Sequence, residues 1–391
     1  MAVAVTEAAT HLVDRRGAWC RLAVVRVVVS AGEASGRVML ELFRQEMAGV
    51  EPDCEVASLA ETGELGPVLG FSEGLRSGLM ARDLLIRAER AVVSLKPDVV
   101  VLVSFSGLHL PLGRLLRRSG LPVLYLGPPQ VWAWGGWRTR RLRRAADKVV
   151  CLFRFEEELL RGAGVDAAYF GYPLLDSVKA ELSRAEVLSR LGLGPSDRYV
   201  VFLPGSRPQE MAYHVPLFAA TYERLRKIMP GIRGVMITVK DGESPKAQGR
   251  WQMAGVAAKG MVVVRENRYD VMRHAECAGA VSGTVTAELA LLGVPMAVCY
   301  HLPSLSRMLA RLVVRTPFFA LPNILAGSGI VPEELEPEPD KLSGFLAPLA
   351  RDSDERRSQV EALGRVAAEL GPAGGMANIC RLAVRMARPG E

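Results

Sequence analysis

Apolar strands alternate with helices over most of the chain, and this alternation predicts an α/β fold. Residues 99–103 read as a strand, with helical periodicity before them at 81–95 and after them at 110–118. A second alternating series runs from Tyr199 to about Pro372. Such alternation is typical of a parallel sheet with both faces covered. Two series predict two Rossmann-like domains facing a cleft, with ligands at the carboxyl ends of the strands.

The order of elements gives the expected domain boundaries. Strands are expected at 22–29, 99–103, 122–126 and 148–153, with helices ending near Glu46 and at 81–95, 110–118, 138–146 and 156–161. Residues 333–341 read as an acidic, proline-bearing loop. We expect a loosely ordered extension at 1–21 and two Rossmann-like domains, at 22–172 and at 173–372. A C-terminal helix at 373–391 is expected to pack back on the first domain.

Composition excludes several classes of protein. The chain has 391 residues, of which 49% are hydrophobic and 23% charged, as in ordinary globular domains. The first 18 residues contain Glu7 and Asp14 and lack an apolar core, so no signal peptide is expected. Six scattered cysteines and five histidines show no metal-ligand spacing, so no metal site is expected. We expect no cofactor either. The net charge of +7 permits phosphorylated ligands, anionic lipid or nucleic acid and selects none.

The most informative segment is 280–295. An apolar strand end leads into the turn Ser282-Gly283-Thr284, and a helix follows, closed by Gly293 and Pro295. A strand, a small-residue turn and a helix direct free backbone N–H groups and a positive dipole end at one spot, which suits a phosphate. Glu288 lies one helical turn further and can accept hydrogen bonds from sugar hydroxyls. The alternative is an ordinary turn with a solvated glutamate.

A second segment has the same organisation. An apolar strand (199–203) is followed by Pro204-Gly205-Ser206 and by Arg207 at the start of the next helix. Arginine is a planar, permanently charged fork that fits phosphate oxygens. Two such sites indicate one nucleotide-binding domain. The alternative for Arg207 is a surface residue near a helix start.

The segment 132–144 is both aromatic and basic. Trp132, Trp134 and Trp137 precede a helix with five arginines. Interfacial tryptophan and clustered arginine suit an anionic membrane surface. The alternatives are tryptophans packed under a loop with solvated arginines, or single-stranded nucleic acid.

Five motifs in order resemble the lipid-A-disaccharide synthase family, inverting glycosyltransferases of the GT-B type. The motifs are Gly32-Glu-Ala-Ser-Gly36, Val131-Trp-Ala-Trp134, Leu203-Pro-Gly-Ser-Arg207 with Glu210, Ser282-Gly-Thr284 with Glu288, and Leu321-Pro-Asn-Ile-Leu-Ala-Gly327. The resemblance implies transfer of 2,3-diacylglucosamine from UDP to 2,3-diacylglucosamine 1-phosphate, giving a β-linked disaccharide 1-phosphate and UDP. It implies no metal and no nucleic acid. It further implies a cytoplasmic protein peripherally associated with the inner membrane, and leaves a homodimer open.

The resemblance also implies that 22–172 is the acceptor-side domain and 173–372 the UDP-sugar-binding domain. It further implies the site residues. UDP-sugar binding falls on Gly205, Ser206, Arg207, Glu210, Ser282, Gly283, Thr284, Glu288 and Asn323. Acceptor or lipid contacts fall on Ser35, Gly36, Arg37, Trp132, Trp134, Trp137, Arg138, Arg140 and Arg141.

The departures from the family pattern lie in the first half. Arg37 stands where the family has Asp, and Ser104 stands where it has an acidic residue proposed as catalytic base. The linker reads Gly-Tyr-Pro at 171–173 instead of Gly-His-Pro, and the segment between Val50 and Gly70 is short. UDP-sugar binding is therefore better supported than the acceptor.

An inverting transfer needs a base near the acceptor hydroxyl. Ser104 cannot serve alone, so we expect Glu33 to act as base or to position the acceptor. His109 is a further candidate because histidine titrates near neutral pH. The alternatives are a helix-cap role for Glu33, a polar loop role for His109 and a solvated Arg37.

Two other functions stay open. One is another UDP-sugar enzyme of the same fold, with a different acceptor or with UDP-N-acetylglucosamine 2-epimerase activity. The other is a catalytically inactive relative that binds UDP-sugar or lipid, which Ser104 and Arg37 motivate.

Overall fold

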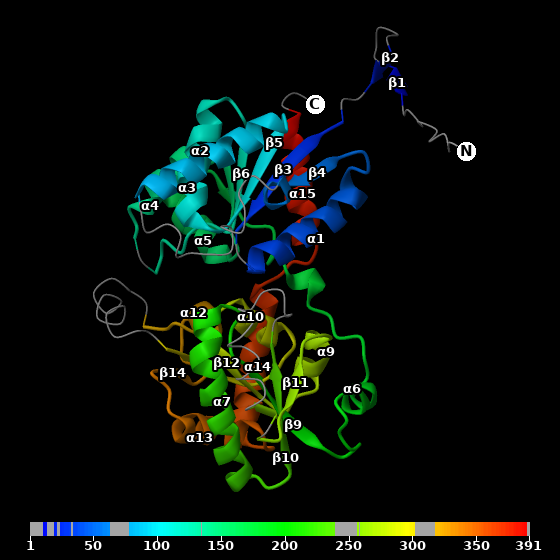
Figure 1. The fold of residues 1–391 in the computed structure, drawn as a ribbon, viewed down its shortest axis with the longest axis vertical. Helices are drawn as coiled ribbons and strands as arrows, with labels where there is room; N and C mark the ends of the chain where they lie inside the picture. Colours follow the sequence, from blue (N-terminus) through cyan, green and yellow to red (C-terminus); the bar gives the residue numbers. More distant parts are fainter. Residues whose placement is uncertain are drawn as a thin grey trace. The chain divides into compact units, whose positions relative to one another are not determined.

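A computed structural model describes residues 11–13, 19–21, 24–32, 34–62, 78–133, 135–238, 256–257, 259–301 and 317–388. These residues belong to two compact units (Figure 1). Unit 1 comprises Met1–Pro128, Arg140–Val150 and Ala377–Glu391, and unit 2 comprises Pro129–Thr139 and Cys151–Met376. Unit 1 is therefore built from three separate segments of the chain.

The first sheet has six strands in the order β4-β3-β5-β6-β7-β8. Its strands are β3 (Arg26–Ala31), β4 (Glu55–Ser58), β5 (Val99–Val103), β6 (Val123–Leu126), β7 (Lys148–Val150) and β8 (Ala167–Ala168). Strands β3 to β7 pair in parallel. All five residues of β5 are buried, as expected for a β-branched strand covered on both faces.

Five helices of the first half of the chain connect these strands or follow them. They are α1 (Ala34–Val50), α2 (Gly78–Ser94), α3 (Ser106–Arg118), α4 (Arg138–Ala145) and α5 (Arg154–Gly162). The chain passes from β3 to β4 in one direction and from β5 through β6 to β7 in the other. Right-handed crossovers therefore put α1 on one face, and α3 and α4 on the other.

The last helix, α15 (Gly375–Ala387), packs against α1. The Cys380 thiol donates to the Phe43 carbonyl oxygen at 3.5 Å, and Arg388 pairs with Glu51 at 3.1 Å. The final helix of the chain thereby covers the first helix of unit 1.

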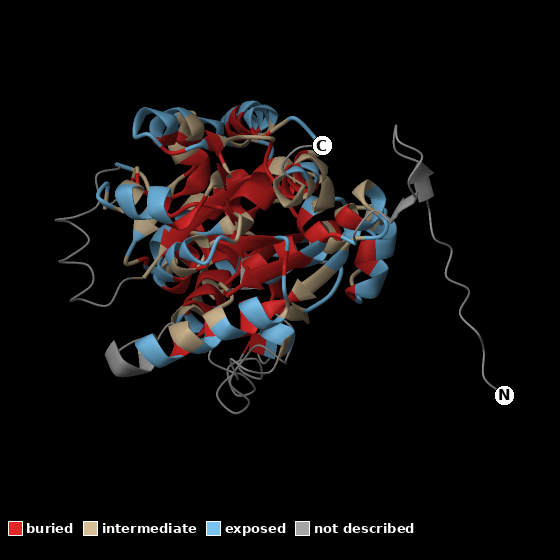
Figure 2. Ribbon diagram, turned by 90° about the horizontal axis from the view of Figure 1, so that it is seen from above, coloured by how far each residue is buried: buried red, intermediate tan, exposed pale blue. Residues whose placement is uncertain are grey.

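The second sheet, in unit 2, has six parallel strands in the order β11-β10-β9-β12-β13-β14. Its strands are β9 (Arg198–Leu203), β10 (Ile232–Ile237), β11 (Val262–Val264), β12 (Ala278–Val281), β13 (Met296–Tyr300) and β14 (Glu333–Leu335). The helices are α6 (Arg184–Arg190), α7 (Pro208–Ile228), α9 (Arg268–Arg273), α10 (Thr284–Leu291), α12 (Leu321–Ala326), α13 (Pro339–Leu349) and α14 (Asp354–Glu369). One apolar cluster packs on each face of this sheet. Figure 2 shows that the interior strands are mostly buried, whereas the helices carry both buried and exposed residues.

The predicted fold class, two Rossmann-like α/β domains, is confirmed. Two local expectations were wrong. The expected loop at 333–341 contains β14 and the start of α13. The strand expected at 148–153 ends at Val150, because the Glu156 carboxylate accepts hydrogen bonds from Leu152 N and Phe153 N and turns the chain into α5. Within the expected N-terminal extension, His11–Val13 and Trp19–Arg21 pair as the antiparallel strands β1 and β2.

Candidate functional site

In unit 2, the two predicted phosphate loops open at the same edge of the sheet. Strands β9 and β12 are parallel neighbours, with Leu203 opposite Ala280 near their carboxyl ends. The chain leaves β9 through α7 toward β10, on the side away from β12. This change of direction creates the crevice in which open α/β sheets bind ligands.

The loop after β9 is organised around the Glu210 carboxylate. Its Oε2 accepts hydrogen bonds from the backbone N–H groups of Ser206 at 3.1 Å and Arg207 at 3.2 Å. Its Oε1 accepts from Arg207 Nη1 at 3.0 Å. Gly205 has φ +97°, and a Cβ there would lie 2.5 Å from Glu210 Oε2. A carboxylate therefore holds the N–H groups and the guanidinium that a phosphate would use, which marks the loop as an anion site.

The turn after β12 presents an uncapped helix start. Gly283 is the N-cap residue of α10 and supplies no side-chain hydrogen bond to the first turn. Ser282 Oγ donates to the Phe319 carbonyl oxygen at 2.8 Å, which ties the turn to the segment before α12. Gly283 is exposed and Thr284 half-buried. The first N–H groups of α10 are therefore placed to meet an anion.

Glu288 lies one turn into α10 and is buried, with 3% of its surface exposed. Its Oε1 accepts hydrogen bonds from Arg268 Nη2 at 2.9 Å and from the Tyr269 hydroxyl at 3.3 Å. Its buried Oε2 has no hydrogen-bond partner among the described residues. Burial raises the pKa of Glu288, and Arg268 opposes that rise. An unpartnered buried acceptor suits a ligand hydroxyl.

Asn323 differs from the other predicted UDP-sugar residues because the chain itself saturates its amide. Its Nδ2 donates to Val331 O and Glu333 Oε2, and its Oδ1 accepts from Ile330 N and Val331 N. The same Glu333 carboxylate accepts from Phe319 N and Ala320 N. Asn323 and Glu333 thus fix the loop that holds Ser282.

In unit 1, the corresponding edge lies where β3 and β5 end side by side, with Ala31 opposite Val103. Ser104 (φ 51°) and Phe105 (φ 42°) are consecutive non-glycine residues in the left-handed region. Such backbone costs roughly 1–3 kcal/mol per residue and collects at functional sites. The Phe105 ring covers Gly32, where an added Cβ would lie 2.4 Å from a ring carbon. The turn after β5 and the loop after β3 are therefore packed together.

His109 is fully buried and holds this turn in place. Its Nδ1 lies 2.9 Å from the Ser104 carbonyl oxygen, and its Nε2 lies 2.9 Å from Ser30 Oγ. A carbonyl only accepts, so Nδ1 carries the proton and Nε2 accepts from the serine hydroxyl. The Tyr125 hydroxyl donates to the same carbonyl at 2.7 Å. Burial lowers the pKa of His109 to about 4.

The remaining candidates of unit 1, which lie after β3 and at the start of α1, are only partly described. Glu33 and the side chain of Ser35 lie outside the described residues. Gly36 is buried, and a Cβ there would lie 3.3 Å from Ala31 Cβ. Arg37 is exposed.

The basic aromatic segment divides into a packed part and an exposed part. Trp132 is half-buried, and its Nε1 donates to Glu156 Oε1 at 3.0 Å. Burial raises the pKa of Glu156 to about 7. Trp137 is 56% exposed, with the Arg138 guanidinium 5.6 Å from its ring centroid. Arg140 and Arg141 are exposed, and Trp134 lies outside the described residues.

Several contributors to these sites have no sequence motif. Arg268 and Tyr269 hold Glu288, yet they follow Asn267 with no recognisable pattern. Glu156 had one signal, since an acidic residue in the first turn favours a helix start. Among the described residues there is no group of three or more His, Cys, Asp or Glu placed to hold a metal. None of the described helices is long and apolar enough to span a membrane.

Sequence comparison finds similar proteins over nearly the whole chain. A family model described as lipid-A-disaccharide synthetase matches residues 27–362. A lipid-A-disaccharide synthase of Solibacter usitatus is 30% identical over 94% of this chain and 98% of its own length. Another, of Geobacter metallireducens, is 28% identical over 92% of this chain and 97% of its own length.

Structure comparison finds the same fold in distant sequences. A UDP-GlcNAc 2-epimerase from Neisseria meningitidis bound to UDP-GlcNAc gives a TM-score of 0.63 at 10% identity, covering 92% of this chain and 100% of that one. Trehalose-6-phosphate synthase OtsA gives 0.56 at 11% identity, covering 93% and 99%. At such identities the likeness concerns the fold.

Proposed function

The chain belongs to the lipid-A-disaccharide synthetase family, and we propose that it transfers 2,3-diacylglucosamine from UDP to 2,3-diacylglucosamine 1-phosphate. It is a glycosyltransferase with a UDP-sugar donor. The observation that carries the assignment within this family is the pair of anion loops after β9 and β12, with the free oxygen of Glu288 beside them. The products are a β-linked disaccharide 1-phosphate and UDP.

We assign the donor residues as follows. Arg207 and the first turn of α10 stabilise the negative charge that grows on the departing diphosphate. Glu210 gives up the N–H groups of Ser206 and Arg207 when the diphosphate arrives, because both anions need the same donors. Glu288 accepts a ribose hydroxyl through Oε2. Asn323 acts through the loop that carries Ser282.

In the transfer, the acceptor 6-hydroxyl oxygen attacks the anomeric carbon while the bond from that carbon to the diphosphate oxygen breaks. UDP leaves with the bonding electrons, and a base takes the hydroxyl proton. We propose Glu33 for that base. His109 is better suited to positioning, because both of its nitrogens are bonded inside unit 1. It shapes the Ser104 turn and moves no proton.

The acylated substrates make a peripheral position on the inner membrane part of this proposal. Of the residues in 132–144 predicted to contact acceptor or lipid, Trp137, Arg140 and Arg141 are exposed and suit a lipid surface. Trp132 instead packs within unit 2. The domain ranges 22–172 and 173–372, the cytoplasmic location and a homodimer remain predictions.

A turnover assay tests the proposed function. UDP-2,3-diacylglucosamine and 2,3-diacylglucosamine 1-phosphate are supplied in detergent, and UDP and disaccharide are both measured. We expect both products in equal amounts. UDP binding without disaccharide would refute the assignment of the acceptor and favour the inactive relative. The variant Glu33→Ala is expected to bind UDP normally and to lose turnover, so near-normal turnover would exclude Glu33 as base.

A further inference from the structure

A basic pocket lies at the amino edge of the first sheet, away from the loops described above. It has a volume of about 590 Å³ and is lined by Arg114, Arg117, Arg118, Gly120, Leu121, Pro122, Arg143, Arg144 and Asp147. All nine residues belong to unit 1. Pro122 directly precedes β6, and Asp147 directly precedes β7. Ser104 follows the carboxyl end of β5, at the opposite edge of the same sheet.

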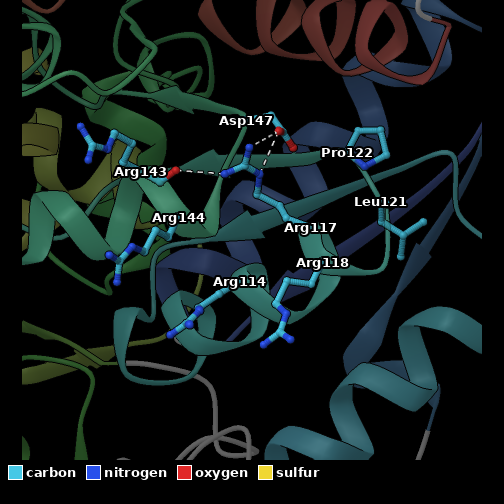
Figure 3. Close-up of a pocket in the computed structure, with 9 residues that line it drawn as sticks. Arg114, Arg117, Arg118, Leu121, Pro122, Arg143, Arg144 and Asp147 are labelled. Atoms are coloured by element: carbon cyan, nitrogen blue, oxygen red, sulfur yellow. Dashed lines mark hydrogen bonds and ion pairs between the residues drawn. The ribbon is translucent and has the colours of Figure 1, made fainter.

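One arginine of the pocket forms its rigid wall. Arg117 Nε and Nη2 donate to Asp147 Oδ1 at 2.8 and 2.7 Å, and Arg117 Nη1 donates to the Arg143 carbonyl oxygen at 3.0 Å (Figure 3). Asp147 Oδ2 accepts from Val123 N at 2.9 Å. The only carboxylate of the lining is therefore engaged on both oxygens, and the ends of α3 and α4 are tied together.

The other four arginines are exposed, and none of their guanidinium groups has a hydrogen bond or ion pair with any described residue. Arg114 and Arg118 project from the C-terminal half of α3, and Arg143 and Arg144 from the last turn of α4 (Figure 3). Neither helix contains an aspartate or glutamate. Like charges gathered without a counter-charge repel one another, so an anion among them is stabilised.

The negative ends of the two helix dipoles do not neutralise this positive charge. A C-terminus carries roughly −0.5 elementary charge, so the two helix ends together offset about one arginine. Five arginines against one aspartate leave a formal charge of +4 on the lining. A strong positive excess remains in a concave site of ligand size, and guanidinium groups fit phosphate oxygens two at a time.

We propose that this pocket binds a phosphate-bearing anion at a site separate from the donor and acceptor sites. The ligand carries a diphosphate or phosphate ester, either in solution or as the headgroup of an anionic lipid. Arg114, Arg118, Arg143 and Arg144 contact its oxygens, and Arg117 holds the ends of α3 and α4 together. The site does not depend on the transferase assignment, because none of its residues belongs to that machinery.

Pyrophosphate binding to the full-length protein at low ionic strength tests the soluble source. The double variant Arg118→Gln/Arg144→Gln is expected to weaken the pocket's affinity at least tenfold. The control Arg381→Gln/Arg385→Gln removes two exposed charges from α15, on the opposite face of unit 1, and is expected to change it less than twofold. Arg207→Gln removes the arginine of the loop after β9, where the UDP-sugar is proposed to bind, and is expected to leave pyrophosphate binding to the pocket intact.

Sedimentation with phosphatidylglycerol-containing vesicles, against phosphatidylcholine vesicles, tests the lipid source with the same variants. Loss of pyrophosphate binding in Arg118→Gln/Arg144→Gln supports the proposal with a soluble ligand. Loss of vesicle binding alone supports it with a lipid headgroup. If neither probe depends on Arg118 and Arg144, or if only Arg207→Gln affects pyrophosphate, the proposal is overturned. Unchanged melting temperatures without ligand establish that the variants are folded.

Discussion

At the scale of single residues, the candidate sites at the carboxyl edges of the two sheets use buried polar groups in opposite ways. Glu288 keeps one oxygen without a partner among the described residues, whereas His109 has both nitrogens bonded. A buried unsatisfied acceptor costs about 1–3 kcal/mol, which a ligand hydroxyl recovers. A saturated histidine gains nothing from a ligand and instead fixes strained backbone. Glu288 therefore acts by binding and His109 by positioning.

The variant Glu288→Gln is expected to weaken UDP binding about tenfold. The amide keeps an oxygen for Arg268 and Tyr269 but replaces the free carboxylate oxygen by an N–H donor, and charge-assisted hydrogen bonds contribute about 1.5–3 kcal/mol. Titration calorimetry with UDP gives the affinity. Tyr269→Phe is the graded control, because it removes the hydroxyl that donates to Glu288 Oε1 at 3.3 Å and accepts from Arg268 Nη2 at 2.6 Å but leaves Glu288 Oε2 in place. We expect less than a threefold effect on the affinity for UDP. Equal UDP affinity in Glu288→Gln and the unmodified protein would contradict the assignment.

His109 is expected to make stability depend on pH. Its pKa in the folded protein is lowered to about 4, against 6.5 when unfolded. The unfolded chain therefore binds the proton first as pH falls, and the stabilisation present above pH 6.5 is lost toward pH 4. Between pH 7.5 and 5 this amounts to about 2 kcal/mol. Urea unfolding of the protein and of His109→Asn, which keeps a donor for Ser104 O, measures it. If both proteins lose the same free energy of unfolding between pH 7.5 and 5, His109 is not the cause of the pH dependence.

At the scale of elements, close helix packing sets the geometry of unit 1. A Cβ on Gly113 of α3 would lie 2.3 Å from the Ala145 carbonyl oxygen at the end of α4. That oxygen belongs to the backbone, so the helices themselves would have to separate. The same approach brings Arg117 to Asp147 and the Arg143 carbonyl.

Gly113→Ala is therefore expected to destabilise the protein by about 1–3 kcal/mol, as overpacking does, despite the better helix propensity of alanine. Gly49→Ala in α1 is the matched control, because a Cβ there meets nothing within 4 Å. We expect it to be neutral or slightly stabilising. Chemical denaturation measures the free energy of unfolding of both variants. Equal values would show that α3 and α4 can separate at Gly113 without a loss of stability.

The elements also show what the sequence could predict. The sequence pattern located β5, β12 and α15 closely. The two strands are fully buried apolar runs, and α15 is a long amphipathic helix. It failed at Val150 and at 333–341, where single carboxylates decide the path: Glu156 ends β7, and Glu333 ties β14 to the segment at 319–320. The loops of the candidate site were predicted from Gly and Ser spacing. Arg268 and the α3 arginines of the pocket, Arg114, Arg117 and Arg118, were given no role, since only the fold brings their helices to those positions.

At the scale of the whole molecule, the order of the chain differs from the order of the units. Ala377–Glu391 returns to unit 1 after all of unit 2 has been made. In α15, Ile379, Cys380 and Ala383 are 0% exposed and Leu382 is 8% exposed. Full burial of one large apolar side chain contributes about 1.5–3 kcal/mol, and a domain has about 5–15 kcal/mol in total. The last helix is thus a large part of the stability of unit 1.

Residues 1–172 expressed alone are therefore expected to lack a cooperative unfolding transition, and residues 373–391 joined to them through a flexible linker are expected to restore it. Circular dichroism during urea unfolding measures the transition. The control carries Ile379→Asp and Cys380→Asp in the joined helix, which keeps its length but removes the apolar face that covers α1, and it should not restore cooperativity. If residues 1–172 alone unfold cooperatively at the midpoint of the joined protein, α15 contributes nothing essential, and unit 1 is complete without the end of the chain.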